Sequence, residues 1–416
     1  MINKKLKVGN VPNLRFPEFE GEWVTKKLGE VMEFKVTNSF SRENLNYEIG
    51  TVKNIHYGDI HTKFQTLFDI QKEVVPFVNE EINLNRISED NYCKDGDIIF
   101  ADASEDLNDV GKSIEVININ NQKLLSGLHT LLARPKSSIF YLGFNGYLFK
   151  SNSVRTQIKK ESQGSKVLSI NAGRISKVEL KIPNIKEQQK IAHFLSLIEE
   201  RIITQNKIIG QLETLIKGLS EKIYSQKIRF KKFTEKWEVK KLGEIATFYS
   251  GGTPLTSKRE YFNGNIPFIR SGEINCGKTE QFISELGLKN SSAKIVEVGD
   301  ILYALYGATS GEIGLSKIRG AINQAVLCIK SDQNHYFIYS YLSYKKESIV
   351  SRYLQGGQGN LSAEIVKQIK IYIPALEEQI NIAGLLSSID QKLQIEKKIL
   401  IEHQSQKQYL LQKLFI

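Results

Sequence analysis

The sequence is poor in cysteine, proline and tryptophan, and the spacing of its few cysteines excludes two kinds of fold. Its 416 residues include three cysteines, eight prolines and two tryptophans. Cys93, Cys276 and Cys328 lie far apart, and none belongs to a C-x-x-C pair. This spacing indicates neither a zinc knuckle nor a disulfide framework, and it fits a reducing compartment.

The sequence also gives little support for a catalytic function. No two prolines are adjacent, which excludes the Asn/Asp-Pro-Pro-aromatic motif with which amino-methyltransferases hold a flipped base. The segment Gly272–Thr279 fits the form G-x-x-x-x-G-K-[ST], but no predicted helix follows it as a phosphate-binding loop requires, so we expect no P-loop motor. His56 and His61 have no cysteine at metal-ligand spacing. We therefore expect no catalytic residue, no metal site and no cofactor bound by this chain.

Long apolar runs are absent as well. Nowhere do about 18 consecutive apolar residues occur, as a membrane-spanning helix requires. Residues 1–10 are polar and basic and lack the apolar segment of a secretory signal. We expect a soluble, cytoplasmic protein with no membrane partner.

Acidic residues are the minority among the charged ones. There are 57 Lys and Arg against 46 Asp and Glu, a formal net charge of +11. Such a balance favours a polyanionic partner such as nucleic acid, because cations neutralise phosphates and release counterions. Chains rich in Lys and Ile are often mildly basic without such a partner, so charge alone leaves both possibilities open.

What the sequence does contain is an internal repeat. Four anchors recur in the same order: Leu14–Val31 with Ile228–Ile245; Gly96–Phe100 with Gly299–Tyr303, followed by Val110–Gly111 with Ile313–Gly314; Leu168–Ser169 with Leu361–Ser362; and Lys181–Ala192 with Tyr372–Ala383. Between the anchors, Phe34–Asn91 and Phe248–Glu297 share little. The pattern indicates a constant frame that carries two divergent inserts.

Each repeat combines strands with helices. Short apolar runs bounded by turn residues predict strands at Ile98–Phe100, Leu180–Ile182, Ile301–Tyr303 and Ile369–Ile373, and a helix is predicted at Tyr336–Leu354. After Pro183 and Pro374, long proline-free stretches predict helices over Glu187–Tyr224 and Glu378–Leu414, each about 55 Å long.

Both long helices carry a heptad seam, in which apolar residues recur in steps of four and three. The predicted seam positions are Ile191, Leu195, Ile198, Ile202, Gln205, Ile209, Leu212, Ile216 and Leu219 in the first helix, and Leu386, Ile389, Leu393, Glu396 and Leu400 in the second. The second seam is weaker, because it also includes His403 and Lys407. Gln205 and Glu396 either set the helix register or are ordinary surface residues.

These features predict an α+β fold: two similar globular α/β units joined by two long antiparallel coiled-coil helices, with a pseudo-twofold internal repeat. The expected segments are a first unit at 1–185, a central helix at 186–226, a second unit at 227–375 and a C-terminal helix at 376–416. Two modules at a fixed separation suit a bipartite DNA target, since module spacing sets half-site spacing. A bivalent protein-binding scaffold would need the same architecture.

The ordered motifs resemble those of a known family. They are Trp-x-x-x-x-Leu-Gly-Glu at Trp23–Glu30 and Trp237–Glu244, Ser250–Pro254, Ile266–Gly272, the Gly-Asp-Ile strand, Ala321–Gln324, Gly359–Ser362, and the Ile-Pro-x-x-x-x-Glu-Gln entry into both long helices. Each motif alone is weak, but the ordered set spans nearly the whole chain. Together they resemble the specificity subunits of type I restriction-modification enzymes.

The resemblance implies two target-recognition domains, each recognising half of a bipartite double-stranded DNA target, separated by coiled-coil spacer helices. It also implies partner subunits that carry the chemistry: two modification subunits that methylate adenine with S-adenosylmethionine, and restriction subunits that translocate and cleave with ATP and Mg²⁺. In that family the specificity subunit is not itself an enzyme.

Base recognition needs side chains that donate or accept hydrogen bonds from loops on a rigid frame. The candidates in the second insert are Thr253, Lys258, Arg259, Arg270 and Ser271, and those in the matching stretch of the first are Lys53, Asn54, His56 and Tyr57. Arg270 is the best single candidate because it follows the predicted strand Ile266–Ile269; a surface ion pair is the alternative.

Further candidates lie in loops of the frame. Tyr306 could stack on a base, Gln324 opens an apolar strand with Thr130 as its expected counterpart, and Lys166 and Gln358 lie in matching Gly-rich loops. A plain turn or a structural role is the alternative for each of them. Trp23 and Trp237 recur in the constant frame, so we expect core anchors rather than stacking platforms.

Overall fold

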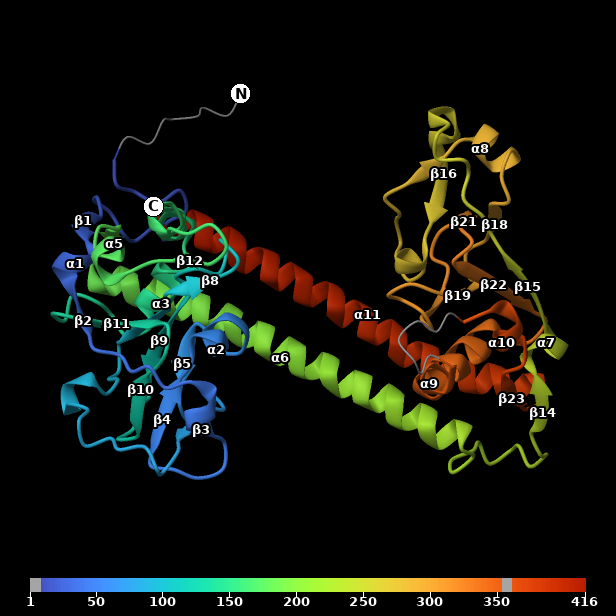
Figure 1. Ribbon diagram of the computed structural model, residues 1–416, viewed down its shortest axis with the longest axis horizontal. Helices are drawn as coiled ribbons and strands as arrows, with labels where there is room; N and C mark the ends of the chain where they lie inside the picture. Colours follow the sequence, from blue (N-terminus) through green and yellow to red (C-terminus); the bar gives the residue numbers. More distant parts are fainter. Residues whose placement is uncertain (1–8, 354–360) are drawn as a thin grey trace. The chain divides into compact units, whose positions relative to one another are not determined.

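Two units make up the chain in the computed structural model, which describes residues 9–353 and 361–416. Unit 1 comprises residues 1–205 and 399–416, and unit 2 comprises residues 206–398. The long helices α6 (Ile185–Tyr224) and α11 (Leu376–Lys413) are therefore each divided between the two units (Figure 1).

Unit 1 contains two main sheets. Its strands are β1 Val24–Lys27, β2 Met32–Lys35, β3 Leu45–Asn46, β4 Val52–Ile55, β5 Leu67–Asp69, β6 Phe77–Val78, β7 Ile98–Ala101, β8 Ala103–Ser104, β9 Ser113–Ile117, β10 Lys123–Ser126, β11 Thr130–Pro135, β12 Leu168–Ser169 and β13 Glu179–Ile182. Its short helices are α1 Leu28–Val31, η1 Arg42–Asn44, α2 Tyr57–Thr62, η2 Glu89–Asn91, α3 Phe144–Leu148, α4 Asn152–Glu161 and α5 Ala172–Ile175. The sheet orders are β2-β11-β7-β9-β5 and β10-β4-β6-β3, beside the pairs β1-β13 and β8-β12.

Unit 2 has the same central arrangement. Its strands are β14 Glu238–Lys241, β15 Ala246–Ser250, β16 Phe262–Ile269, β17 Phe282–Ile283, β18 Lys294–Val296, β19 Ile301–Ala304, β20 Ile313–Leu315, β21 Gly320–Ile322, β22 Val326–Ser331 and β23 Lys370–Ile373. Its shorter helices are α7 Leu242–Ile245, η3 Arg259–Tyr261, η4 Ser271–Glu273, α8 Glu285–Lys289, α9 His335–Tyr353 and α10 Ala363–Lys367. The sheet orders are β15-β22-β19-β20 and β17-β16-β21-β18, beside the pair β14-β23.

A shared frame recurs in both units, as the repeat predicts. The order β2-β11-β7-β9 in unit 1 matches β15-β22-β19-β20 in unit 2, and β1-β13 matches β14-β23. The central strands β7 and β19 are buried on both faces, which explains their unbroken apolar sequences. The fold is α+β, and the four predicted strands and the two long helices are confirmed within a few residues.

A three-residue clasp closes the frame at the start of each long helix. In unit 1, Arg15 Nε and Trp23 Nε1 donate to the carboxylate of Glu187 at 2.8 and 3.3 Å. In unit 2, Arg229, Trp237 and Glu378 repeat these contacts at 2.8 and 3.2 Å. Both tryptophans are buried, which confirms them as core anchors.

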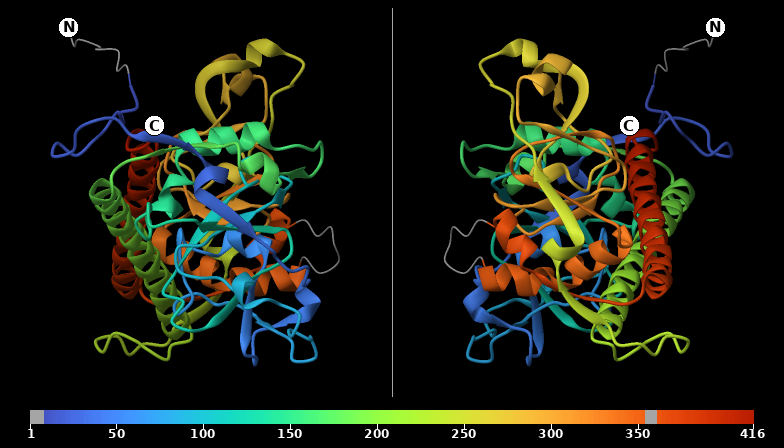
Figure 2. Two further views of the ribbon diagram at one scale, coloured as in Figure 1. Left: turned by 90° about the vertical axis from the view of Figure 1, so that its left-hand side faces the viewer. Right: turned by 90° about the vertical axis from the view of Figure 1, so that its right-hand side faces the viewer.

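Each unit contains parts of both long helices, which run antiparallel (Figures 1 and 2). In unit 1, Lys407 of α11 pairs with Glu199 of α6 at 2.6 Å. In unit 2, Lys397 pairs with Glu213 at 2.7 Å. The residue number in α6 rises from 199 to 213 as the number of its partner in α11 falls from 407 to 397. The predicted antiparallel direction is therefore confirmed.

The predicted seam positions are all buried or half-buried. Gln205 is 7 % exposed and Glu396 is half-buried. By contrast, Ile203 and Ile395, next to the seam, are 44 % and 56 % exposed. The predicted seam is therefore the face of each helix that is covered, in the part of the helix that belongs to each unit.

Strand register corrects one match made from sequence. The loop from β7 to β9 has 11 residues (102–112), whereas the loop from β19 to β20 has 8 (305–312). Gly111 and Gly311, each the second-last residue of its loop, both have positive φ, at 66° and 86°, a conformation that favours glycine. They are the true counterparts, so the match of Val110–Gly111 with Ile313–Gly314 is wrong by three residues.

A second match is wrong by two residues. The Ile170 N–H donates to Asp102 O and the Leu361 N–H donates to Leu305 O, both at 2.8 Å. Asp102 and Leu305 each follow the matched strands β7 and β19. Ile170–Asn171, rather than Leu168–Ser169, therefore corresponds to Leu361–Ser362.

Across residues 9–353 and 361–416, no helix is long and apolar enough to span a membrane.

Candidate nucleic-acid interface

A parallel strand pair in each unit places a divergent residue at an equivalent point. In unit 1, β4 pairs in parallel with β10, and the Gly127 N–H donates to Ile55 O at 2.9 Å. In unit 2, β16 pairs in parallel with β21, and the Asn323 N–H donates to Ile269 O at 3.4 Å. The residue that follows Ile55 in unit 1 is His56, and the residue that follows Ile269 in unit 2 is Arg270. We call these two the strand-end residues.

In unit 1 the strand-end residue belongs to a ring cluster. Tyr57 contacts His56, His61 and His129 with ring centroids 4.6, 6.0 and 5.3 Å apart. His56 Nδ1 accepts a hydrogen bond from the Gly58 N–H at 3.2 Å and caps α2. Burial, followed by the charge of Arg42, lowers the pKa of His56. The cluster therefore favours a neutral His56 beside the half-buried Tyr57.

The other two candidates on β4 face opposite sides of the strand. Lys53 is half-buried, with Nζ 5.6 Å from the centre of the Phe77 ring. Asn54 is 0 % exposed, and its Oδ1 accepts a hydrogen bond from Asn38 Nδ2 at 2.7 Å. Side chains alternate along a strand, so Asn54 points inward. Because its side chain is buried, the prediction of Asn54 as a DNA contact is corrected.

In unit 2 the strand-end residue is held by two carboxylates. Arg270 Nε lies 3.1 Å from Glu273, and its Nη2 lies 2.7 Å from Glu280. The Arg270 side chain is 39 % exposed. The ion-pair alternative for Arg270 is therefore present in the structure, while the guanidinium remains at the surface. Ser271, the next residue, begins η4 and is half-buried.

Two candidates far apart in sequence come together. Thr253 Oγ1 donates to Gln324 Oε1 at 2.6 Å, and both side chains are exposed. Gln324 immediately follows Asn323, whose counterpart is Gly127. Its own counterpart is therefore Leu128, and the expected match with Thr130 is wrong.

The remaining candidates are separate from these groups. Lys258 and Arg259 are exposed, with Lys258 Nζ 5.2 Å from the centre of the Tyr261 ring. Tyr306 is half-buried and Lys166 is exposed. Gln358 lies outside the described residues.

A basic and aromatic group in unit 1 was not predicted from sequence. Arg42 and Lys63 both pair with the buried Asp59, at 3.0 and 2.9 Å, and both side chains are about half exposed. Lys63 Nζ also lies 5.8 Å from the centre of the exposed Tyr47 ring. Asp59 lies in the first turn of α2, two residues after Tyr57, so these cations lie beside the ring cluster around Tyr57.

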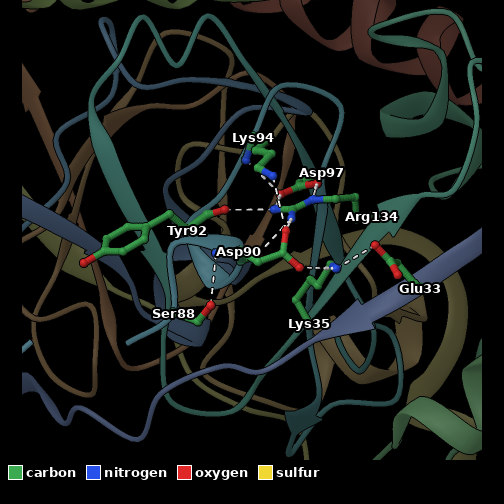
Figure 3. Close-up of polar contacts among 8 residues, drawn as sticks. All are labelled: Glu33, Lys35, Ser88, Asp90, Tyr92, Lys94, Asp97 and Arg134. Atoms are coloured by element: carbon green, nitrogen blue, oxygen red, sulfur yellow. Dashed lines mark hydrogen bonds and ion pairs between the residues drawn. The ribbon is translucent and has the colours of Figure 1, made fainter. Parts of the chain in front are cut away.

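Figure 3 shows the network that joins the first insert to the shared frame. Arg134 on β11 is 8 % exposed and binds Asp97 through two bonds of 2.8 and 2.7 Å. It also donates to the backbone carbonyls of Asp90 and Tyr92, each at 2.8 Å. Lys35 on β2 pairs with the Asp90 carboxylate at 2.5 Å. The end of the insert is thus fixed to two frame strands.

Unit 2 contains a simpler version of this pair. Lys330 on β22 pairs with Asp300 at 3.2 Å. Asp97 and Asp300 also accept the backbone N–H of the residue three positions earlier, Lys94 or Glu297, at 2.8 Å in both cases. The recurring Gly-Asp-Ile motif therefore shapes a turn and anchors a basic side chain of the frame.

Comparison with known proteins identifies the repeat. The family model for the type I restriction modification DNA specificity domain matches residues 20–214 and 234–403. The chain belongs to this family. Each match contains one frame with its insert and its strand-end residue, and membership in a DNA specificity family supports DNA recognition over a protein-binding scaffold.

Relatives of this type I specificity protein match it over most of its length or over part of it. The putative type I restriction enzyme MjaX specificity subunit of Methanocaldococcus jannaschii is 27 % identical over 418 residues, covering 95 % of this chain and 91 % of the relative. The EcoR124I/EcoR124II specificity subunit of Escherichia coli is 26 % identical over 176 residues, covering 40 % of this chain and 43 % of that one. The crystal structure of the S subunit from M. genitalium has a TM-score of 0.65 at 19 % identity, covering 98 % of this chain and 99 % of that one.

The specificity family recognises DNA and is not catalytic, and the described side chains suit recognition. Among residues 9–353 and 361–416, no group of three or more His, Cys, Asp or Glu side chains is placed to hold a metal ion. The strand-end residues and their neighbours are instead donors, acceptors and aromatic rings, which are the groups used for base contacts and stacking.

Proposed function

We propose that this chain is the DNA-recognition subunit of a type I restriction-modification complex and that each unit recognises one half of a bipartite target. The observation that carries the proposal is the contrast between frame and strand end. The Arg-Trp-Glu clasp recurs contact for contact, whereas the strand end carries His56 and Tyr57 in one unit and Arg270 and Ser271 in the other. A common frame with different contact residues suits two different half-sites.

The proposal divides the chain into target-recognition domains at 1–185 and 227–375 and spacer helices at 186–226 and 376–416. Two modification subunits and the restriction subunits would dock on this chain. They would bring S-adenosylmethionine, ATP and Mg²⁺, and would perform methylation and cleavage, whereas this chain would bind no cofactor.

Among the candidates, Arg270, Thr253 and Gln324 would contact one half-site, and Tyr57 with Lys53 and His56 the other. Arg270 would have to exchange Glu280 for a base edge or a phosphate. This exchange would cost little, because an exposed ion pair such as the one between Arg270 and Glu280 contributes only about 0–1 kcal/mol to stability.

DNA binding of the full chain, alone and with its modification subunit, tests the proposal in a mobility-shift assay across a salt series. Cations that contact phosphates release counterions, so the affinity should fall steeply as salt rises. Lys166→Gln should reduce the affinity for all sequences alike if Lys166 contacts phosphate, with Lys26→Gln as an exposed control outside the candidate set. Binding that is absent or insensitive to salt would refute DNA recognition.

A further inference from the structure

Two cavities occupy matching places in the two units. The unit 1 cavity, of about 790 Å³, lies among α2, α4, the start of β9 and residues 407–412 of α11. The unit 2 cavity, of about 590 Å³, lies among α9, residues 213–221 of α6 and residues 386–393 of α11. In the alignment of the long helices, residues 216–221 of α6 are the counterparts of 407–412 of α11. The repeat therefore allows the chemistry of the two cavities to be compared directly.

The two cavities differ in charge. The unit 1 cavity is lined by five cationic side chains, Lys112, Lys150, Arg155, Lys159 and Lys407, and by no carboxylate. The unit 2 cavity is lined by two cationic side chains, Lys217 and Lys346, and by four acidic ones, Glu213, Glu221, Glu347 and Asp390. The shared fold does not require cations at this place, so their concentration in unit 1 calls for another reason.

Only part of the positive charge in unit 1 is neutralised by neighbouring carboxylates. Glu199 pairs with Lys407 at 2.6 Å and reaches Lys150 through the hydroxyl of Thr66, with bonds of 2.6 and 2.8 Å. Asp109 pairs with Lys112 at 2.6 Å. Five cations against these two anions leave a surplus of three positive charges.

The other two cations contact neutral oxygens. Arg155 Nη2 donates to the backbone carbonyls of Asn108 and Val110 at 3.0 and 2.7 Å. Lys159 Nζ donates to the side-chain oxygen of Asn108 at 2.7 Å. These contacts hold both cations at the cavity without offsetting their charge.

Three buried polar atoms at the cavity have no hydrogen-bond partner among the described residues. Two of them are the donors Ser113 Oγ, on a side chain that is 2 % exposed, and Arg155 Nη1, and the third is His61 Nδ1. An unpaired buried donor costs about 1–3 kcal/mol. Burial and the nearby charges of Lys407, Lys112 and Arg155 also lower the pKa of Lys150 to about 8, against the opposing effect of Glu199. A bound anion would offset both costs.

We propose that the unit 1 cavity binds a small polyphosphate, either free or as part of a nucleotide. Its volume falls in the range of about 300–1,000 Å³ that is usual for small-molecule sites. Lysine, arginine and hydroxyl groups are the usual ligands of phosphate. A surplus of three charges matches the several charges of a polyphosphate, whereas each phosphodiester of DNA carries one. This site is independent of the proposed DNA recognition.

Calorimetric titration of the full chain with pyrophosphate at low salt tests the proposal. We expect saturable binding of about one equivalent. The double variant Lys112→Gln with Lys159→Gln should weaken binding by about tenfold or more, because it removes two charge-assisted contacts. The matched unit 2 variant, Lys217→Gln with Lys346→Gln, should change the affinity by less than about twofold.

A second variant guards against a folding defect. Asn152→Glu places a carboxylate at the exposed start of α4, beside the cavity, where the helix tolerates an acid. It should also weaken pyrophosphate binding, while circular dichroism and thermal melting stay unchanged. Saturable binding that a random-sequence duplex does not displace supports the proposal.

Three results would overturn it. They are no saturable binding by the unaltered chain, an equal loss in the unit 2 variant, and duplex binding that depends on Lys112 and Lys159 without any pyrophosphate binding. The last result would assign the cations to the DNA backbone.

Discussion

At the residue scale, the buried ion pair between Arg134 and Asp97 holds Arg134 in the frame, where its guanidinium also binds the backbone carbonyl of Asp90 at the end of the first insert. Arg134→Ala would leave the Asp97 carboxylate buried without a cation, since its side chain is 1 % exposed. We expect a loss of about 3–5 kcal/mol in the free energy of unfolding of unit 1, measured by chemical denaturation.

The matched substitution in unit 2 is the control. The Lys330 side chain is 41 % exposed, so water can solvate both members of its pair with Asp300 more readily. Lys330→Ala should therefore cost clearly less than Arg134→Ala. Equal losses would contradict the special role of the Arg134 network.

Glu115 is a second residue with a measurable consequence. Its side chain is fully buried and accepts the Gly143 and Gly146 N–H groups at 2.7 and 2.6 Å, with no cation in contact in the described chain. Burial raises its pKa from 4.5 to about 7. Between these values the folded state binds more protons than the unfolded state, so stability should fall as pH rises from about 4.5 to about 7.

Urea denaturation across this pH range measures the effect. Glu115→Gln cannot ionise, so it should flatten this part of the stability profile, although it also lowers stability because an amide has one acceptor oxygen. Glu105→Gln, at an exposed position, should keep the slope of the unaltered chain. An unchanged slope in Glu115→Gln would refute a raised pKa.

At the element scale, the end of α11 and the residues that follow it complete the core of unit 1. Leu410, Leu414 and Phe415 are buried in the cluster that contains Trp23 and Phe144. The end of α6 has the same role in unit 2, where Tyr224 contacts Phe337 with ring centroids 5.6 Å apart. Both units therefore depend on the end of a helix that begins in the other unit.

This dependence predicts a large effect of Leu414→Ala. The side chain is 2 % exposed, and truncating a buried leucine costs about 2–5 kcal/mol. Tyr409→Ala, five residues earlier in α11 but 55 % exposed, should change the free energy of unfolding by no more than about 0.5 kcal/mol. Thermal unfolding should show the loss in the transition of unit 1, and a loss confined to unit 2 would contradict the assignment.

The elements also show how far sequence could go. Buried strands such as β7 and β19 have unbroken apolar sequences, and the seams have a clear period, so both could be predicted. The Leu-Ser anchor was misplaced because two residues are too few to fix an alignment when loop lengths differ. Asn54 was misjudged because β4 lies in a divergent insert, where no repeat indicates which face is buried.

The candidate site was only partly predictable for a related reason. His56 and Arg270 each follow a short strand, β4 in unit 1 and β16 in unit 2. Both strands form a parallel pair, which supports the match of the two residues. The contacts of Tyr57 with His129 and of Asp59 with Arg42 join residues far apart in sequence. Such contacts follow from sheet order, which a single sequence does not contain.

At the scale of the whole molecule, one frame occurs twice and carries two different sets of strand-end residues. The family match covers both copies, and the strand-end residues differ between them. If each unit recognises its own half-site, the two recognitions should be separable by exchange of one insert.

Methylome sequencing of cells that contain this chain and its modification subunits tests that claim most directly. Replacing Phe248–Glu297 with the insert of a relative of different specificity should change one half-site of the methylated motif and leave the other half-site unchanged. A motif in which both half-sites change, or in which neither changes while methylation persists, would contradict the account.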